Sequence, residues 1–101
     1  MHKSLRWKRN ASTLALHGAL DRDTLIALWQ QRNDLINKVE NIDVSGLILI
    51  DSAGLALLIH LQELVRRQCA APYFIGISDK LQSLINLYNL QNIIFSVEKS
   101  D

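Results

Sequence analysis

The sequence predicts an α/β fold in which a β-hairpin opens the chain and helices then alternate with strands. Three observations support this prediction. Alternating apolar residues flank a turn at residues 10–12, apolar residues recur at helical spacing in three later segments, and short apolar runs separate those segments. A chain of 101 residues is long enough for one domain, expected over residues 1–101 with a polar tail at about 98–101.

Two short strands are expected around residues 5–8 and 14–17, and a helix is expected over residues 23–39. In that helix Trp29 falls on an apolar arc with Leu25, Leu28, Leu35, Ile36 and Val39. Arg32 falls inside the same arc. Either the arc is not fully buried, or the stem of Arg32 lies on apolar surface while its guanidinium reaches water.

Later elements alternate regularly. Residues 42–50 form either one bulged strand or a strand and a loop, and a helix is expected at about 53–68. A strand is expected at 73–77, a helix capped by Ser78 or Asp79 follows it, and a last strand is expected at 93–97. Strands joined through helices should pair in parallel with right-handed crossovers.

Composition excludes several classes of function. A net charge of +1 argues against a nucleic-acid partner. The basic residues of the first strand fit a solvated face better than a membrane-binding or nucleic-acid-binding arm; they are His2, Lys3, Arg6, Lys8 and Arg9. Residues 44–61 fail as a membrane span, since Asp51 lies near their middle. A lone cysteine, Cys69, cannot form an internal disulfide, so we expect a cytoplasmic protein without direct membrane insertion.

The most informative stretch runs from Ile48 to Leu58. An apolar run stops at Asp51-Ser52, passes through Ala53-Gly54 and becomes apolar again with a helical period. This pattern predicts a strand that leads into a helix, with Ser52 at or beside the N-cap. The positive end of the helix dipole could hold a phosphate on Ser52 or a partner's carboxylate, although capping alone also explains the pair.

Catalytic signatures are missing from the sequence. There is no Walker A motif, no G-x-S-x-G and no Cys/His constellation, so no cofactor or metal is expected. His60 lies about two turns into the predicted helix, and a serine nucleophile at Ser52 would need a base within hydrogen-bond reach. The carboxylates at element ends are interpreted as caps; they are Asp21, Asp43, Asp51 and Asp79. We therefore expect a protein that is not an enzyme.

An off-core apolar side of the second long helix predicts a partner surface. Leu55 and Ile59 lie more than about 100° from the arc of Leu57, Leu61 and Leu64. They form a patch with Ser52, Gln62 and Arg66, which we expect to bind a partner. The alternative is that another element of the domain covers this side. Trp29 is either an interface anchor in the same surface or part of the core.

Three motifs then carry a resemblance. Gly18-Ala19-Leu20-Asp21, Ile42-Asp43-Val44-Ser45 and above all Asp51-Ser52-Ala53-Gly54-Leu55 resemble the STAS domain, the fold of anti-sigma-factor antagonists and of transporter regulatory domains. Ser4-Leu5-Arg6-Trp7, Thr13-Leu14-Ala15-Leu16 and Leu87-Tyr88-Asn89-Leu90 are similar to the STAS subunits of phospholipid-transport ABC complexes.

The resemblance implies a mixed β-sheet with helices packed on it, in a subunit without catalytic activity. Such a subunit binds the transporter's ATPase on the cytoplasmic side and supports assembly and activity of a complex that maintains outer-membrane lipid asymmetry. The resemblance also implies an alternative, because anti-sigma-factor antagonists are phosphorylated at the position of Ser52. A phosphate there would add about −1.5 to −2 charges beside Asp51, near Asp21, and could expel a partner.

Overall fold

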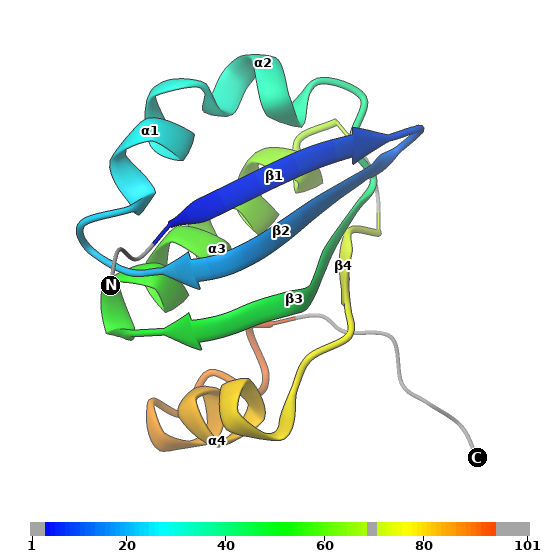
Figure 1. Cartoon of the computed structure of the whole chain (residues 1–101). Helices are drawn as coiled ribbons and strands as arrows, with labels where there is room; N and C mark the ends of the chain where they lie inside the picture. Colours follow the sequence, from blue (N-terminus) through cyan, green and yellow to red (C-terminus); the bar gives the residue numbers. More distant parts are fainter. Residues whose placement is uncertain (1–3, 69–70, 95–101) are drawn as a thin grey trace.

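The predicted hairpin opens the structure. In the computed structural model, β1 (Leu5–Asn10) pairs antiparallel with β2 (Thr13–Leu20), and Ala11 takes a positive φ of 56° in the turn between them. β3 (Asn41–Ile50) and β4 (Tyr73–Ile75) add in parallel, which gives a four-stranded sheet in the order β1-β2-β3-β4 (Figure 1). The expected mixed sheet with parallel crossover pairing is confirmed.

The structure describes residues 4–68 and 71–94. The predictions for His2, Lys3, Cys69, the strand residues 95–97 and the polar tail therefore lie outside the described residues. Ile93 and Ile94, where the last strand was expected to begin, lie in a turn whose amides bond to the carbonyl of Leu90.

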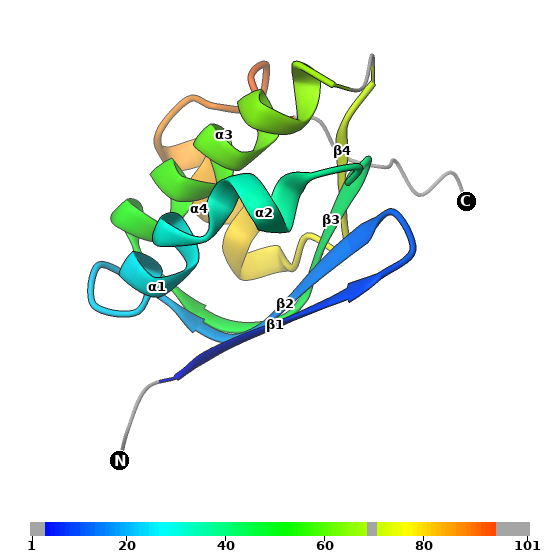
Figure 2. The same cartoon turned by 90° about the horizontal axis from the view of Figure 1, so that it is seen from above.

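All four described helices lie on one side of the sheet (Figure 2). They are α1 (Leu25–Gln30), α2 (Arg32–Ile36), α3 (Ser52–Arg66) and α4 (Asp79–Leu87). Ser78 caps α4 as predicted, because its hydroxyl accepts from the Leu81 amide at 3.1 Å. The core lies between sheet and helices, and its fully buried members include Leu14, Leu16, Leu20, Leu28, Leu55, Leu58, Leu61, Ile85, Val39 and Val65.

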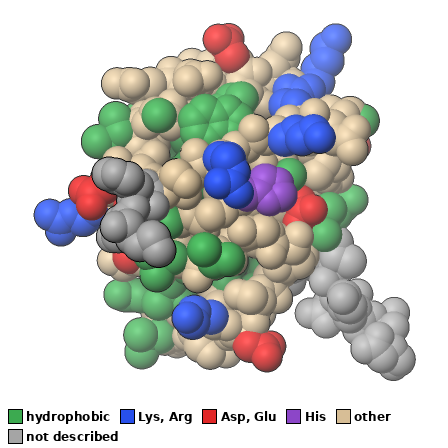
Figure 3. Space-filling model, viewed as in Figure 1, with side chains coloured by type: hydrophobic (Ala, Val, Ile, Leu, Met, Phe, Trp, Pro, Cys, Tyr) green, Lys and Arg blue, Asp and Glu red, His purple; other side chains and the backbone are tan. Residues whose placement is uncertain are grey.

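The opposite face of the sheet carries two basic residues of β1. Arg6 and Lys8 are exposed there, whereas Leu5 and Trp7 point to the helix side and are half-buried. Figure 3 shows Lys, Arg and His side chains across this face. The interpretation of β1 as a strand with a solvated basic side is confirmed for Arg6 and Lys8, but it is wrong for Arg9, whose guanidinium reaches the end of α2.

The single helix expected over residues 23–39 is wrong: the chain breaks it at Gln31 into α1 and α2. Gln31 has φ −102° and ψ 10°, and its amide bonds to the Leu28 carbonyl in a tighter turn. The guanidinium of Arg32 donates to the Trp29 carbonyl at 2.8 Å beside this break. Arg9 holds the end of α2 from the sheet by donating to the carbonyls of Leu35 and Asn37.

β3 is one strand with two irregularities, so the bulged-strand interpretation of residues 42–50 is correct. Its register against β2 shifts between Asp43 and Gly46 and again at Ile48, whose side chain is 78% exposed. β4 pairs only with Asn41, Ile42 and Asp43, and ends two residues earlier than predicted. Beyond that point α4 lies beside the edge of β3, with Ser78, Lys80 and Leu81 near residues 47–50.

The start of α3 is pressed against the end of β2. A Cβ added at Gly54 would lie 2.3 Å from the Leu20 carbonyl oxygen and 3.0 Å from Cγ1 of Ile50. The Leu20 carbonyl also accepts from the Asp51 amide at 3.3 Å. Gly54 therefore permits the close approach of helix and strand that places Ser52.

We predict that Gly54→Ala destabilises the fold by about 1–3 kcal/mol, although alanine favours helices, because the added methyl must push α3 away from β2. Urea unfolding followed by circular dichroism measures this loss. Ser83→Ala, on an exposed position of α4, should change the free energy of unfolding by less than about 0.5 kcal/mol. Equal stability of the two variants would contradict the proposed contact.

Candidate docking site beside Ser52

Ser52 is the first residue of α3, and Asp51 rather than Ser52 is the N-cap. The Asp51 carboxylate accepts from the Gly54 amide at 2.8 Å and from the Arg22 amide at 3.2 Å. Ser52 is exposed, and its hydroxyl makes no hydrogen bond with the residues that the structure describes. Capping is thus done by Asp51, which leaves the Ser52 hydroxyl open to solvent or to a partner.

Asp21 organises the neighbouring loop from inside the protein. It is 2% exposed, and its Oδ1 accepts from the amides of Asp23 at 2.9 Å and Thr24 at 3.0 Å. Thr24 in turn donates from its hydroxyl to the Ala19 carbonyl at 2.9 Å. The N-cap of α1 is Thr24, without a side-chain capping bond, so the expectation that Asp21 caps this helix is wrong; Asp21 instead holds the turn before it. This loop and the Asp51 turn meet through the Arg22 amide.

An apolar groove of about 230 Å³ opens between α1 and α3, next to Ser52. Ala53 and Ala56 form the bottom of the groove, and because their side chains are only methyl groups they leave open space above α3. Trp29 and Leu25 form the wall of the groove on α1, and Leu57 and His60 complete it on α3. Trp29 is half-buried, so it belongs both to the core boundary and to this open surface.

The side chains of His60, Trp29 and Arg32 pack against one another beside the groove. The Trp29 indole meets the His60 imidazole edge-on, with ring centroids 5.6 Å apart, and the Arg32 guanidinium carbon lies 3.8 Å from the Trp29 ring centroid. The sequence left open whether the apolar arc is partly exposed or the stem of Arg32 lies on it. Both apply in part, because Trp29 on that arc is half-exposed and the half-buried Arg32 covers its ring. This packing fixes the orientation of Trp29.

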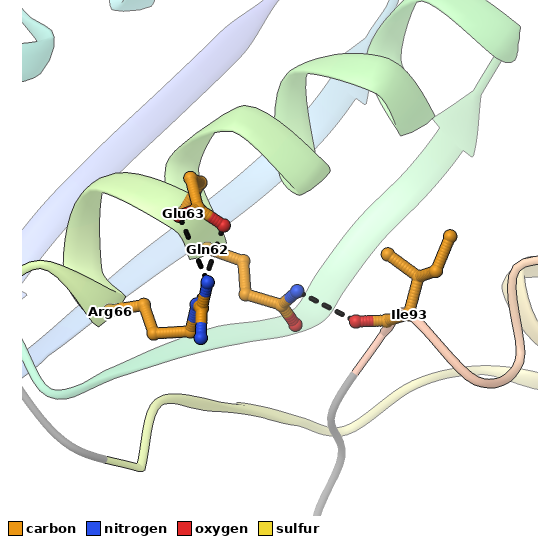
Figure 4. A network of polar contacts seen from close by, with 4 residues as sticks. All are labelled: Gln62, Glu63, Arg66 and Ile93. Carbon is orange, nitrogen blue, oxygen red and sulfur yellow. Dashed lines mark hydrogen bonds and ion pairs between the residues drawn. The ribbon is translucent and has the colours of Figure 1, made fainter.

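The expected exposed patch on α3 is wrong at two positions. Leu55 is 2% exposed and Gln62 is 5% exposed, because the sheet and the turn after α4 cover this side of the helix. The Gln62 amide donates to the Ile93 carbonyl at 2.8 Å, which ties α3 to that turn (Figure 4). Ile59 is half-buried against the core, and Arg66 is exposed with its guanidinium paired to Glu63 at 3.3 Å.

The exposed stripe of α3 instead runs through Ser52, Ala56 and His60. These residues are four apart, so they share one face of the helix. The sequence signal was present in this spacing, but two of the three side chains are small or polar and did not stand out. Of the predicted site residues, the structure brings Ala53 and Trp29 together at the groove, with Ser52 next to Ala53 at the start of α3, and leaves Leu55, Gln62 and Arg66 elsewhere on α3.

The geometry around Ser52 favours packing over reaction chemistry. His60 lies two turns along α3, about 12 Å away along the axis, and its ring packs on Trp29. His17 lies against Gly46 on the sheet face without helices. Among residues 4–68 and 71–94 no group of three His, Cys, Asp or Glu residues could hold a metal ion, and no helix is long and apolar enough to span a bilayer.

An opening hairpin, two parallel strand crossovers and a helix that begins at Asp51-Ser52 define a STAS-type α/β domain. The family model described as "Mlab, STAS domain" matches residues 4–96, so the chain belongs to this family. Two curated relatives carry the name "Intermembrane phospholipid transport system binding protein MlaB", one from Escherichia coli K12 and one from Shigella flexneri. Each is 41% identical over 90 residues, which covers 89% of this chain and 93% of the relative.

Solved structures support the fold. The unphosphorylated anti-sigma factor antagonist SpoIIAA superimposes with a TM-score of 0.64 at 13% identity, covering 95% of this chain and 89% of its own. The phosphorylated form from Bacillus gives a TM-score of 0.63 at 14% identity, covering 94% and 92%. At this level of identity the similarity concerns the fold alone.

We predict that Leu55→Ala destabilises the domain by about 2–5 kcal/mol, because Leu55 is a buried core residue. Ala56→Glu, one position further along α3, should change the free energy of unfolding by less than about 0.5 kcal/mol, because Ala56 is exposed. Denaturant unfolding of the two variants checks the pair. A fully stable Leu55→Ala variant would restore the surface first expected from the sequence.

Proposed function

We propose that this chain is the STAS subunit of an intermembrane phospholipid transport system. In this role it binds the ATPase of the ABC complex on the cytoplasmic side, supports assembly and activity of the complex, and so maintains outer-membrane lipid asymmetry. The observation that carries the proposal is the apolar groove at the exposed start of α3, in a chain 41% identical to proteins named as the binding protein of that system.

The groove has the features of a protein-binding site. Tryptophan is enriched among residues that dominate binding energy, and Trp29 is held in place by Arg32 and His60. The methyl groups of Ala53 and Ala56 let another backbone or side chain approach α3 closely. Because the lining residues stand on two helices, binding requires little reorganisation of this surface.

The proposed role is non-catalytic. The Ser52 hydroxyl lies too far from His60 for activation, and the adjoining surface is apolar and open, which suits the packing of a partner's side chains. Asp21 and Asp51 serve the backbone amides of two loops. We expect this subunit to act through contact alone.

We predict that Trp29→Ala weakens binding to the ATPase by about 30-fold or more, as truncation of an aromatic anchor does. Ala56→Glu should also abolish co-purification, because it puts bulk and charge into the apolar groove. Co-expression of the tagged ATPase with each variant, followed by affinity purification and binding measurements on the purified pair, tests both.

Lys8→Glu is the matched control, since Lys8 is exposed and alternates along β1 with Leu5 and Trp7, which pack against the core on the helix side. It should co-purify like the unmodified chain. If Trp29→Ala and Ala56→Glu also co-purify normally while remaining folded, the groove is not the ATPase site.

We infer a second candidate function from Ser52 itself, that of an anti-sigma-factor antagonist switched by phosphorylation. The Ser52 hydroxyl is exposed at the first residue of a 15-residue helix, whose dipole favours an added phosphate. The phosphate would stand beside the groove and add about −1.5 to −2 charges there.

Intact-mass measurement of the chain isolated from its own cells, and after incubation with a cognate switch kinase, tests this candidate. One added phosphate that disappears in Ser52→Ala is the expected result for a switch. An unmodified mass under both conditions removes the candidate and leaves the docking function in place.

A further inference from the structure

We propose that Arg32 is the charged half of the docking site, and that it binds a carboxylate of the ATPase whose neighbouring apolar side chain fills the groove. This inference rests on the proposed function and adds the chemistry of the partner segment: an Asp or Glu next to an apolar residue.

Arg32 is held beside the groove in a fixed orientation. Its guanidinium lies over the Trp29 ring at 3.8 Å, and Nη1 donates to the Trp29 carbonyl at 2.8 Å. An arginine fork has several N–H donors in one plane, and the contact with the Trp29 carbonyl engages one nitrogen. The remaining donors are available on a half-buried, pre-oriented group, which reduces the entropy cost of pairing with a carboxylate.

No carboxylate of the described part of the chain meets this group. The described ion pair joins Arg66 to Glu63. Within residues 4–68 and 71–94, the hydrogen bond and the ring contact of the Arg32 guanidinium are both made to Trp29. Asp34 is two positions away on α2, a spacing that places two side chains on different sides of a helix. Arg9 offers a contrast, since its fork already bonds to the carbonyls of Ala11, Leu35 and Asn37.

The charges around the groove favour an anionic partner group at this point. Asp51 at the N-cap of α3 and Asp21 in the loop after β2 both accept hydrogen bonds from backbone amides. Arg32 is thus a half-buried cation stacked on Trp29, which lines the apolar groove, and a charge-assisted bidentate contact with a carboxylate is stronger than a contact between neutral groups. A protein side chain fits better than a lipid headgroup, because the adjoining groove is sized for side chains and lies between two helices.

The experiment measures affinity of the purified full-length chain for the purified ATPase at low and high salt. Arg32→Gln should weaken binding by about 10- to 100-fold at low salt and remove most of its salt dependence. Arg32→Lys should retain part of the salt dependence, because it keeps the charge and loses the fork. Arg67→Gln, the same change at an exposed residue after α3, should leave affinity within about twofold.

The outcomes separate this inference from the proposed function. If the unmodified chain binds and Trp29→Ala does not, but Arg32→Gln binds like Arg67→Gln, then Arg32 is only a support for Trp29 and the inference is wrong. Arg32→Gln is compared only if it is as stable as the unmodified chain in thermal unfolding. If it is less stable, Arg32→Lys decides: a bidentate contact is refuted when Arg32→Lys binds the ATPase with the same affinity and the same salt dependence as the unmodified chain. Failure of the unmodified chain to bind the ATPase overturns both proposals.

Anionic phospholipid vesicles serve as the opposing probe. Vesicles containing phosphatidylglycerol should not bind the chain in an Arg32-dependent way. If they do, and the ATPase does not, the anion is a lipid phosphate and the inference is refuted.

Discussion

The helix α3 is buried on two of its sides, and the shape of the candidate docking site beside Ser52 depends on this burial. Leu57, Leu61 and Val65 are buried on the helix, and Leu55, Leu58 and Gln62 are buried as well. Between Ser52 and Leu61 the exposed positions form a narrow stripe of Ser52, Ala56 and His60. Because that stripe carries small side chains, α1 and α3 leave a groove between them, and Trp29 on α1 becomes its most prominent wall. The site is therefore apolar because α3 packs closely against the rest of the domain and presents small side chains at the groove next to Trp29.

Much of the fold could be predicted from the sequence, because the information was local. Alternation located the hairpin, helical spacing located α3 and α4, and Asp51-Ser52 located the turn between β3 and α3. The break at Gln31 could not be found this way, since apolar spacing continues across it and the break depends on tertiary contacts of Trp29, Arg32 and Arg9. At the predicted site, the structure shows Ser52 exposed and Trp29 lining an open groove, while the binding roles of both residues stay predictions.

The error at Leu55 and Gln62 has an instructive cause. Helical angle alone separates the sides of a helix but does not count its neighbours, and a short α/β domain can cover a helix from two directions. Here the second cover comes from the sheet and from the turn after α4, whose Ile93 carbonyl accepts from the Gln62 amide. Gln62 is a polar residue beside apolar ones, a pattern that predicts an exposed position. In the folded chain its buried side chain joins the turn after α4 to α3.

β3 pairs with β2 along its whole length, but on its other side it pairs with β4 only as far as Asp43. Past Asp43 that second edge has no neighbouring strand among the described residues, so its backbone groups could pair with an extended peptide. A regular ladder in that position would be a template for runaway strand addition. The bulge at Ile48 interrupts the regular spacing of backbone groups along β3, and the start of α4 lies beside residues 47–50 and covers this part of the edge. The irregular register and the neighbouring helix thus leave little of this edge of β3 open for pairing with a strand of a second copy.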